Sequence, residues 1–236
     1  MLGIRLPPRQ KTREDAEKPF WISFSDLMSA LMVLFLVAMT VALLAVTNEI
    51  SAAEQEKAQR DAEIEQLLAR IKEITKDFPG VTLKGRRVDF GDRARFDTNS
   101  HQLSQEQANL LRAVVPKILE IARDPLGQKW LKRVVVEGFA DQRGTYLHNL
   151  NLSLQRSERV MCELLAPKSA AATMGEQDRL SVRELFLVGG SSFNALKASL
   201  EESRRIELRL EFLDIGEHRP ASRDIPLDEN PRCPID

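Results

Sequence analysis

The amino-acid sequence predicts a single transmembrane helix followed by an α/β domain, layered as an α+β sandwich. Two observations carry this prediction. The run from Leu27 to Val46 holds twenty residues without a charge, and at about 1.5 Å per residue it spans about 30 Å, the thickness of a bilayer's hydrocarbon core. The rest of the chain mixes amphipathic helical patterns with β-branched strands. The near balance of 34 basic and 35 acidic residues gives no sign of a nucleic-acid partner.

We assign residues 21–47 to the transmembrane helix, surrounded by membrane lipid. A cleaved signal peptide is the competing interpretation, because a basic segment precedes the apolar run. The apolar region of a signal peptide is normally ~7–15 residues long, shorter than the run here, and Asp26 interrupts the start of the run. The transmembrane assignment therefore fits the length better.

The charges that flank the helix predict its orientation, since Lys and Arg favour the cytoplasmic side. The N-terminal flank is basic and the following segment is not: residues 1–20 contain Arg5, Arg9, Lys11, Arg13 and Lys18, whereas residues 47–66 contain Lys57 and Arg60. We expect a single-pass protein of the bacterial inner membrane, with residues 1–20 in the cytoplasm and everything after the helix in the periplasm.

Residues 48–80 are predicted to form a periplasmic helical linker, because Glu, Gln, Lys, Ala and Arg dominate the segment and favour helix. Pro79 and Gly80 end it. One apolar stripe runs along this helix, wide enough to pack against a partner or an identical copy: Ile64, Leu67, Leu68, Ile71, Ile74 and Phe78. A solvated spacer and a short dimeric coiled coil both fit the stripe, and the segment is also a candidate plug.

Residues 81–213 are predicted to form the α/β domain. Its first long helix, 104–124, has Ser104 as the N-cap and Gln107 three residues later, a capping-box pattern, and Pro116 is expected to kink it. A strand over 131–141 and a helix over 146–166 follow, and then strands over 182–190 and 203–212. Residues 214–236, with several prolines and many charges, are predicted to be an extended tail.

The sequence contains no recognisable catalytic arrangement. It has no phosphate-binding loop and no HExxH metal pair, and its three histidines are scattered at positions 101, 148 and 218. We therefore expect no enzyme activity, no cofactor and no metal. Cys162 and Cys233 both lie in the exported part, where a disulfide is chemically permitted, although two free thiols are also compatible with the sequence.

Asp26 is the candidate for chemistry within the membrane. A carboxylate at the centre of a membrane helix costs ~2.5–3.5 kcal/mol on insertion scales, and less near an end. Asp26 lies near the cytoplasmic end, so a side chain that only reaches the headgroups is one interpretation. Asp is too short to reach far, however, and Ser29 and Ala30 make the same face small enough for close helix packing. Acids in such positions typically mark ion pathways.

Two stretches resemble known families. The first, "WISFSDLMSALMVLFLVAM" from Trp21, resembles the transmembrane signature of MotB-type stator subunits, with an aromatic residue, polar residues, an Asp, a small-residue step and a Met/Leu/Phe run. The resemblance implies that Asp26 binds the proton or other ion that powers a rotary motor. It also implies a homodimer of this B subunit inside a ring, expected to be a pentamer, of MotA-like A subunits.

The second stretch, "VVVEGFADQRGTYLHNLNLSLQRSERV" at 134–160, resembles the core of an OmpA-like peptidoglycan-binding domain. Asp141 and Arg156 match the acid and base that hold diaminopimelate in that family. The full binding set implied is Asp141, Tyr146, Asn149, Leu152 and Arg156. Physically, a zwitterionic ligand needs one carboxylate and one guanidinium. A structural ion pair between Asp141 and Arg156 is the alternative, and Phe139-Ala140 departs from the family's usual His-Thr.

Among MotB-like proteins, the short N-terminal segment and spacer are most similar to the MotB-like subunit of the Zorya anti-phage defence system. The resemblances together imply a wall-anchored B subunit of a proton-driven inner-membrane motor that senses or signals phage attack. A flagellar stator subunit and a passive peptidoglycan tether are the alternatives. A peptidoglycan enzyme is disfavoured by the missing catalytic residues. The sequence leaves open whether the ion is a proton or sodium, the copy number and the trigger.

Overall fold

The computed structural model describes residues 13–165, 174–219 and 233–235, with side chains from Trp21 onward except Ile22. The first part of the predicted cytoplasmic segment and most of the predicted tail, 1–12, 220–232 and 236, lie outside the described residues. The chain divides into two compact units, Met1–Glu56 and Lys57–Asp236. The predicted segment boundaries at residues 20, 47, 80 and 213 stay predictions.

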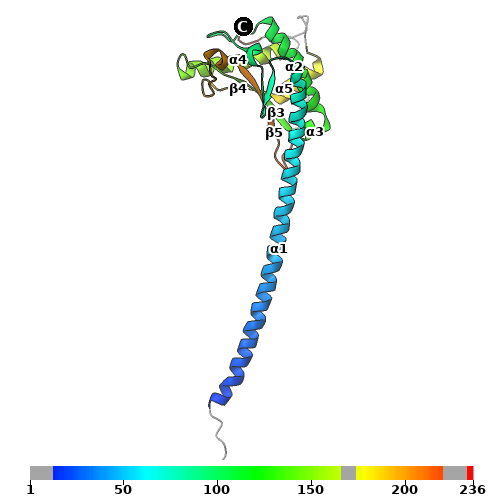
Figure 1. The fold of residues 1–236 in the computed structure, drawn as a ribbon, viewed down its shortest axis with the longest axis vertical. Coiled ribbons are helices and arrows are strands. Elements are labelled where there is room, and N and C mark those ends of the chain that lie inside the picture. The colour runs from blue at the N-terminus through cyan, green and yellow to red at the C-terminus, as the bar shows by residue number, and fades with distance from the viewer. Residues whose placement is uncertain (1–12, 166–173, 220–232, 236) are drawn as a thin grey trace, which may run out of the picture. The chain divides into compact units, whose positions relative to one another are not determined.

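The longest element is helix α1 (Arg13–Lys76), seen in Figure 1 as the blue-to-cyan ribbon. Within the described part of the chain, α1 is the one helix that is long and apolar enough to cross a membrane. Large apolar side chains between Trp21 and Ile50 are exposed on it, among them Leu34 and Phe35. Such exposure around a helix is expected where lipid is the solvent.

A five-stranded sheet forms the centre of the second unit. Its strands lie in the order β1 (Thr82–Lys84), β2 (Arg87–Asp89), β5 (Ile206–Phe212), β3 (Leu131–Gly138) and β4 (Phe186–Gly190). The β3–β4 pair is parallel and the other pairs are antiparallel. The last strand in sequence is therefore central, and this places the residues before Ile206 beside the end of β3.

Short and long helices complete this unit. They are the 3-10 helix η1 (Gly91–Ala94), α2 (Gln105–Arg123), α3 (Pro125–Trp130), α4 (Tyr146–Leu165), α5 (Glu176–Leu185) and α6 (Leu200–Ser203).

The capping box predicted at Ser104 and Gln107 is confirmed in both directions, and α2 continues through Pro116. Alternate residues of β5, from Ile206 to Phe212, are buried in the core as their spacing predicts. Cys162 and Cys233 form a disulfide, which decides between the two alternatives left open by the sequence.

The apolar stripe of the predicted linker packs against its own domain. Ile64, Leu67, Leu68 and Ile71 belong to the buried core, and Ile74 and Phe78 pack on it. Polar contacts hold the same segment: Glu63 accepts a hydrogen bond from Lys129 Nζ at 2.6 Å, and Arg60 Nε donates to the Leu213 carbonyl at 2.9 Å. The chain's own domain therefore covers this stripe, which is neither the solvated spacer nor the coiled coil that the sequence left open. Helical periodicity reveals a buried face but not what buries it.

A second correction concerns residues 182–185, which were expected to begin a strand. They form the last turn of α5, and β4 starts at Phe186. Val182 and Leu185 are both buried, and their three-residue spacing puts them on one helical face. An apolar run does not by itself show where a helix ends and a buried strand begins.

Candidate functional site

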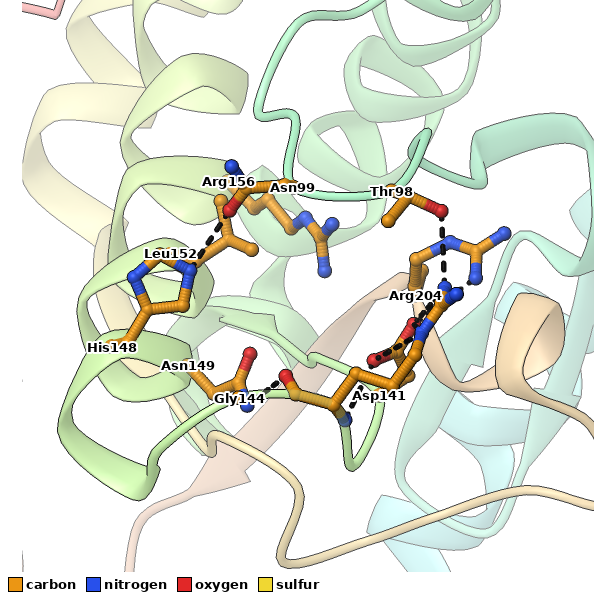
Figure 2. Close-up of a pocket in the computed structure, with 10 residues that line it drawn as sticks. Thr98, Asn99, Asp141, Gly144, His148, Asn149, Leu152, Arg156 and Arg204 are labelled. Atoms are coloured by element: carbon orange, nitrogen blue, oxygen red, sulfur yellow. Dashed lines mark hydrogen bonds and ion pairs between the residues drawn. The ribbon is translucent and has the colours of Figure 1, made fainter.

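A cavity of about 280 Å³ lies where β3 ends and α4 begins (Figure 2). Four of the five predicted peptidoglycan-binding residues line it: Asp141, Asn149, Leu152 and Arg156. The remaining lining residues are Thr98, Asn99, Arg143, Gly144, His148 and Arg204. Three separate stretches of sequence therefore line one cavity.

Small residues and one buried amide shape the turn between β3 and α4. A Cβ on Gly138 would lie 2.0 Å from the Ser153 carbonyl oxygen, so glycine is required for α4 to approach the strand this closely. Gly144 has a φ of +95°, a conformation that glycine adopts without strain. The Asn149 side chain donates to the Arg143 carbonyl at 2.8 Å. These contacts fix the loop that carries Asp141 and Arg143.

Asp141 is buried beneath two arginines. Its carboxylate accepts hydrogen bonds from the backbone N–H of Arg143 at 3.0 Å, from Arg143 Nη2 at 2.8 Å and from Arg204 Nη1 at 3.1 Å. Burial alone would raise the pKa of Asp141, but the hydrogen bonds from Arg143 and Arg204 outweigh it and lower the pKa from 3.8 to about 2. Asp141 is therefore a carboxylate throughout the physiological pH range.

Arg156 is fully buried on α4 and contacts backbone carbonyls. It donates to Ser100 at 2.9 Å, to Phe139 at 2.7 Å and to Asp97 at 3.1 Å, and its guanidinium lies 4.9 Å from the centre of the Phe96 ring. Burial lowers the pKa of Arg156 most, and the nearby Arg204 cation lowers it further. Asp141 opposes both effects, and the resulting pKa is about 10. The guanidinium is still protonated at neutral pH.

The structural ion pair considered between Asp141 and Arg156 is not formed. The ion-pair partners of Asp141 are Arg143 and Arg204. Both Asp141 and Arg156 nevertheless face the same cavity (Figure 2). Neither residue is therefore bound by the other, although each already has partners in the protein, and both line the cavity in which a ligand would bind.

Comparison with known proteins gives one full-length relative. No protein-family model matches the chain. The Zorya protein ZorB of Escherichia coli O139:H28 (strain E24377A / ETEC) is 42% identical over 230 residues, which cover 95% of this chain and 93% of that protein. The chain belongs to the ZorB family.

Solved structures similar to this ZorB-family chain are more distant. The periplasmic domain of Helicobacter pylori MotB is 14% identical, with a TM-score of 0.39, and the match covers 58% of this chain and 83% of that one. The OmpA-like domain of FopA1 from Francisella tularensis is 17% identical, with a TM-score of 0.37, and the match covers 57% of this chain and 82% of that one. The fold class expected from the sequence, one long apolar helix and a mixed α/β domain, is confirmed.

The structure places the other two candidate residues of this ZorB-family chain outside the cavity. Tyr146 begins α4 and is partly exposed, with its ring edge-on to Phe193 at 5.6 Å and its hydroxyl accepting from Asn194 at 3.2 Å. Asp26 lies on α1 in the first unit and is exposed, and the nearby Ser29 hydroxyl donates to the Ser25 carbonyl at 2.8 Å. Their predicted roles stay predictions.

Sequence reasoning missed several residues of the cavity, above all Arg143 and Arg204. Arg143 is two positions after Asp141 in the same Gly-containing turn, so its proximity follows from the turn itself. Arg204 is 63 positions away and reaches Asp141 because β5 pairs with β3. The Arg204-Arg205 doublet before an alternating strand was the available signal, but without the strand order its target could not be identified.

Proposed function

We propose that this ZorB-family chain is the wall-anchored B subunit of a proton-driven rotary motor in the bacterial inner membrane. The observation that carries the proposal is the similarity to ZorB over 95% of the chain, which includes both the apolar helix and the α/β domain. MotA-like A subunits, as a pentamer around a dimer of this chain, are the proposed membrane partners. Rotation would signal phage attack on the cell envelope.

Asp26 is the proposed proton carrier. It is the one ionisable residue between Trp21 and Val46, and desolvation makes an isolated acid at such a position costly unless it has a partner or a role. A carboxylate can take up and release a proton as it passes between two environments, whereas its amide isostere cannot. The coupling of proton flow to rotation would therefore depend on this one residue.

The cavity at the β3–α4 turn is the proposed site of attachment to peptidoglycan. Its charged groups, three arginines and one aspartate, suit the carboxylates of a peptide stem because guanidinium groups bind carboxylates in a bidentate manner. Attachment in the periplasm would hold this subunit stationary while the A subunits turn around it. The N-terminus then lies in the cytoplasm, as the flanking charges favour.

The test is proton flux into liposomes that contain the full chain together with its A partner. We expect Asp26→Asn to abolish the flux while the complex still assembles, because Asn preserves the size of the side chain and removes its proton exchange. Thr40→Val is the matched control, since Thr40 lies on the same helix and its hydroxyl donates to the Val37 carbonyl at 2.8 Å. This variant is expected to conduct normally.

A flux that Asp26→Asn leaves unchanged would refute the role of Asp26. A second assay decides between a motor and a passive tether. If neither protein conducts protons, and cells that carry Asp26→Asn remain protected against phage, the chain is a tether that anchors the envelope without ion transport.

A further inference from the structure

We propose that residues 233–235 form a redox-dependent clamp on a part of the chain that borders the cavity, and that the Cys162–Cys233 disulfide keeps this clamp closed. The clamped part is residues 97–104, which we call the rim segment. The inference rests on the proposed attachment to peptidoglycan, since it concerns how firmly the cavity holds its ligand. Oxidised protein would hold the ligand firmly, and reduced protein would release it more readily.

The rim segment has no regular structure that keeps it in place. Residues 97–104 form neither helix nor strand, and Asn99 has a φ of 53°, which is uncommon for a residue other than glycine. Thr98 and Asn99 both line the cavity. The position of this side of the cavity therefore depends on the contacts that the rim segment makes with other parts of the domain.

Contacts with residues of α4 hold the first half of the rim segment. Arg156 donates to the carbonyls of Asp97 and Ser100 at 3.1 and 2.9 Å. Figure 2 shows the contact between Asn99 and His148, whose Nε2 lies 2.8 Å from the Asn99 side-chain oxygen. Both partners on α4 line the cavity themselves. A displacement of the rim segment therefore changes the shape of the cavity.

The clamp contacts the rim segment at His101. The Ile235 carbonyl lies 3.3 Å from His101 Nε2 and accepts a hydrogen bond from Arg159 Nη2 at 3.3 Å. Arg159 is on α4, one turn after Arg156. One carbonyl thus bridges α4 and the rim segment, directly beside Ser100, whose own carbonyl is bound by Arg156.

The disulfide is what keeps the Ile235 carbonyl at this position. Its two contacts are both 3.3 Å long, slightly beyond the usual N–H···O range. Hydrogen bonds of this length offset little of the conformational entropy that is lost when a chain segment is ordered. The disulfide attaches Cys233 to α4, and Ile235 is two residues further on, within about 7 Å. Without the covalent bond, we expect the clamp to open.

Reduction of the disulfide follows ordinary thiol–disulfide exchange. Cys162 and Cys233 are partly exposed, so a soluble dithiol can reach the bond. One thiolate of the dithiol attacks a sulfur and breaks the bond, and the second thiolate resolves the mixed disulfide. Two electrons and two protons from the dithiol leave two thiols on this chain and one disulfide on the donor. The chain before the clamp keeps its own contact, because Arg219 donates to the Leu131 carbonyl at 3.1 Å.

The experiment uses the full chain in nanodiscs, oxidised or reduced with dithiothreitol. The probe is a soluble muropeptide, the disaccharide tetrapeptide of diaminopimelate-type peptidoglycan. We expect reduction to raise the dissociation constant about three- to tenfold, because the rim segment must then be ordered when the ligand binds. Reoxidation should restore the original value. Far-UV circular dichroism at the same temperature checks that the domain is still folded.

Hydrogen–deuterium exchange tests the clamp without a ligand. At short labelling times, reduction should speed the exchange of amides in residues 97–104. The amides of β3 and β5 should stay protected at these times, because they exchange through unfolding of the whole domain. A disulfide that only stabilises the domain as a whole would leave both the short-time exchange of the rim segment and the dissociation constant unchanged.

His101→Ala separates the clamp from the disulfide, because it removes the side chain that faces the Ile235 carbonyl and keeps the covalent bond. This variant should bind the muropeptide about as weakly as the reduced wild type, and reduction should weaken its binding little further, since both changes remove the same contact. Cys162→Ser/Cys233→Ser should also bind weakly and be insensitive to dithiothreitol. His218→Ala is the matched control: His218 is exposed and lies outside the cavity, and both redox states should keep their wild-type values.

The possible failures are distinguishable. Equal dissociation constants for the oxidised and reduced wild type would overturn the inference and leave the proposed wall attachment intact. An effect of reduction that His101→Ala does not reproduce would overturn the role of the contact between His101 and Ile235. Failure of the oxidised wild type to bind the muropeptide would overturn the wall attachment and the control of binding with it, while the exchange measurement would still decide whether the clamp exists.

Discussion

The buried carboxylate of Asp141 makes the cavity sensitive to acid. Its pKa is about 2 in the folded protein against 3.8 for an ordinary Asp. A depressed carboxylate pKa means that the charged form is favoured by folding, so its contribution to stability is complete above about pH 4 and is lost as the pH falls through about 2. Acidification to about pH 2 is therefore expected to weaken the contacts of Asp141 with Arg143 and Arg204.

We predict a pH-dependent difference in stability between the wild type and Asp141→Asn. The difference should reach at most about 2 kcal/mol at neutral pH, and solvent screening of the half-exposed Arg143 reduces it further. Urea unfolding at pH 7, 4 and 2.5 measures it, and the difference at pH 2.5 should fall to about a third of its value at pH 7. A difference that stays constant across this range would assign the effect of the substitution to something other than the charge of Asp141.

The residue types of the site could be predicted from sequence better than their partners could. The motif at 134–160 contains Asp141, Asn149, Leu152 and Arg156, and the structure brings all four to one cavity. Their partnerships were not predictable, because Asp141 pairs with Arg204 through the β3–β5 register. Arg156 binds carbonyls from residues 97, 100 and 139. Its replacement by Ala would thus impair folding, whereas the half-exposed Arg143 can be replaced with less effect on the fold.

At the scale of elements, the C-terminal turns of α1 act as a core helix of the α/β domain. Periodicity predicted the buried face correctly, including Ile64 and Leu67. It could not identify the covering surface, because the same stripe would serve a coiled coil. The boundary of α5 was unpredictable for a related reason: the run at 182–188 is apolar enough for either a helix or a buried strand, and the core decides between them.

We predict that Leu67→Ala lowers the free energy of unfolding of the domain by about 2–5 kcal/mol, because it leaves a cavity in the core. The adjacent Gln66 is exposed, and Gln66→Ala should change stability by no more than about 0.5 kcal/mol. Chemical denaturation followed by circular dichroism compares the two. If Leu67→Ala instead left the domain stable and weakened self-association, the coiled-coil interpretation of the stripe would be restored.

At the scale of the whole molecule, the disulfide joins parts of the chain that are distant in sequence. Cys162 on α4 and Cys233 in the tail are 71 residues apart. Beside the disulfide, the Ile235 carbonyl accepts a hydrogen bond from Arg159 Nη2 at 3.3 Å and lies 3.3 Å from His101 Nε2. Ser100, next to His101, accepts a hydrogen bond from Arg156, so the tail is connected to the wall of the cavity.

We predict that the double variant Cys162→Ser/Cys233→Ser loses up to about 4 kcal/mol of stability, the chain-entropy contribution expected for a loop of this length. Thermal unfolding of the full chain, oxidised and reduced, measures the loss. A reductant should lower the melting temperature of the wild type and leave the double variant unchanged. Equal melting temperatures for the oxidised and reduced wild type would mean that the tail contributes nothing to the fold.

The continuity of α1 has a mechanical consequence. The helix runs unbroken from Arg13 to Lys76, and its last turns carry core residues of the domain. A load applied along the helix is thus borne by the same side chains that keep the domain folded. Forced unfolding is governed by the unfolding rate constant. The time for which the helix stays attached to the folded domain under tension is therefore set by the unfolding rate constant of the domain. Substitutions that speed unfolding shorten this time even when they lie far from the cavity.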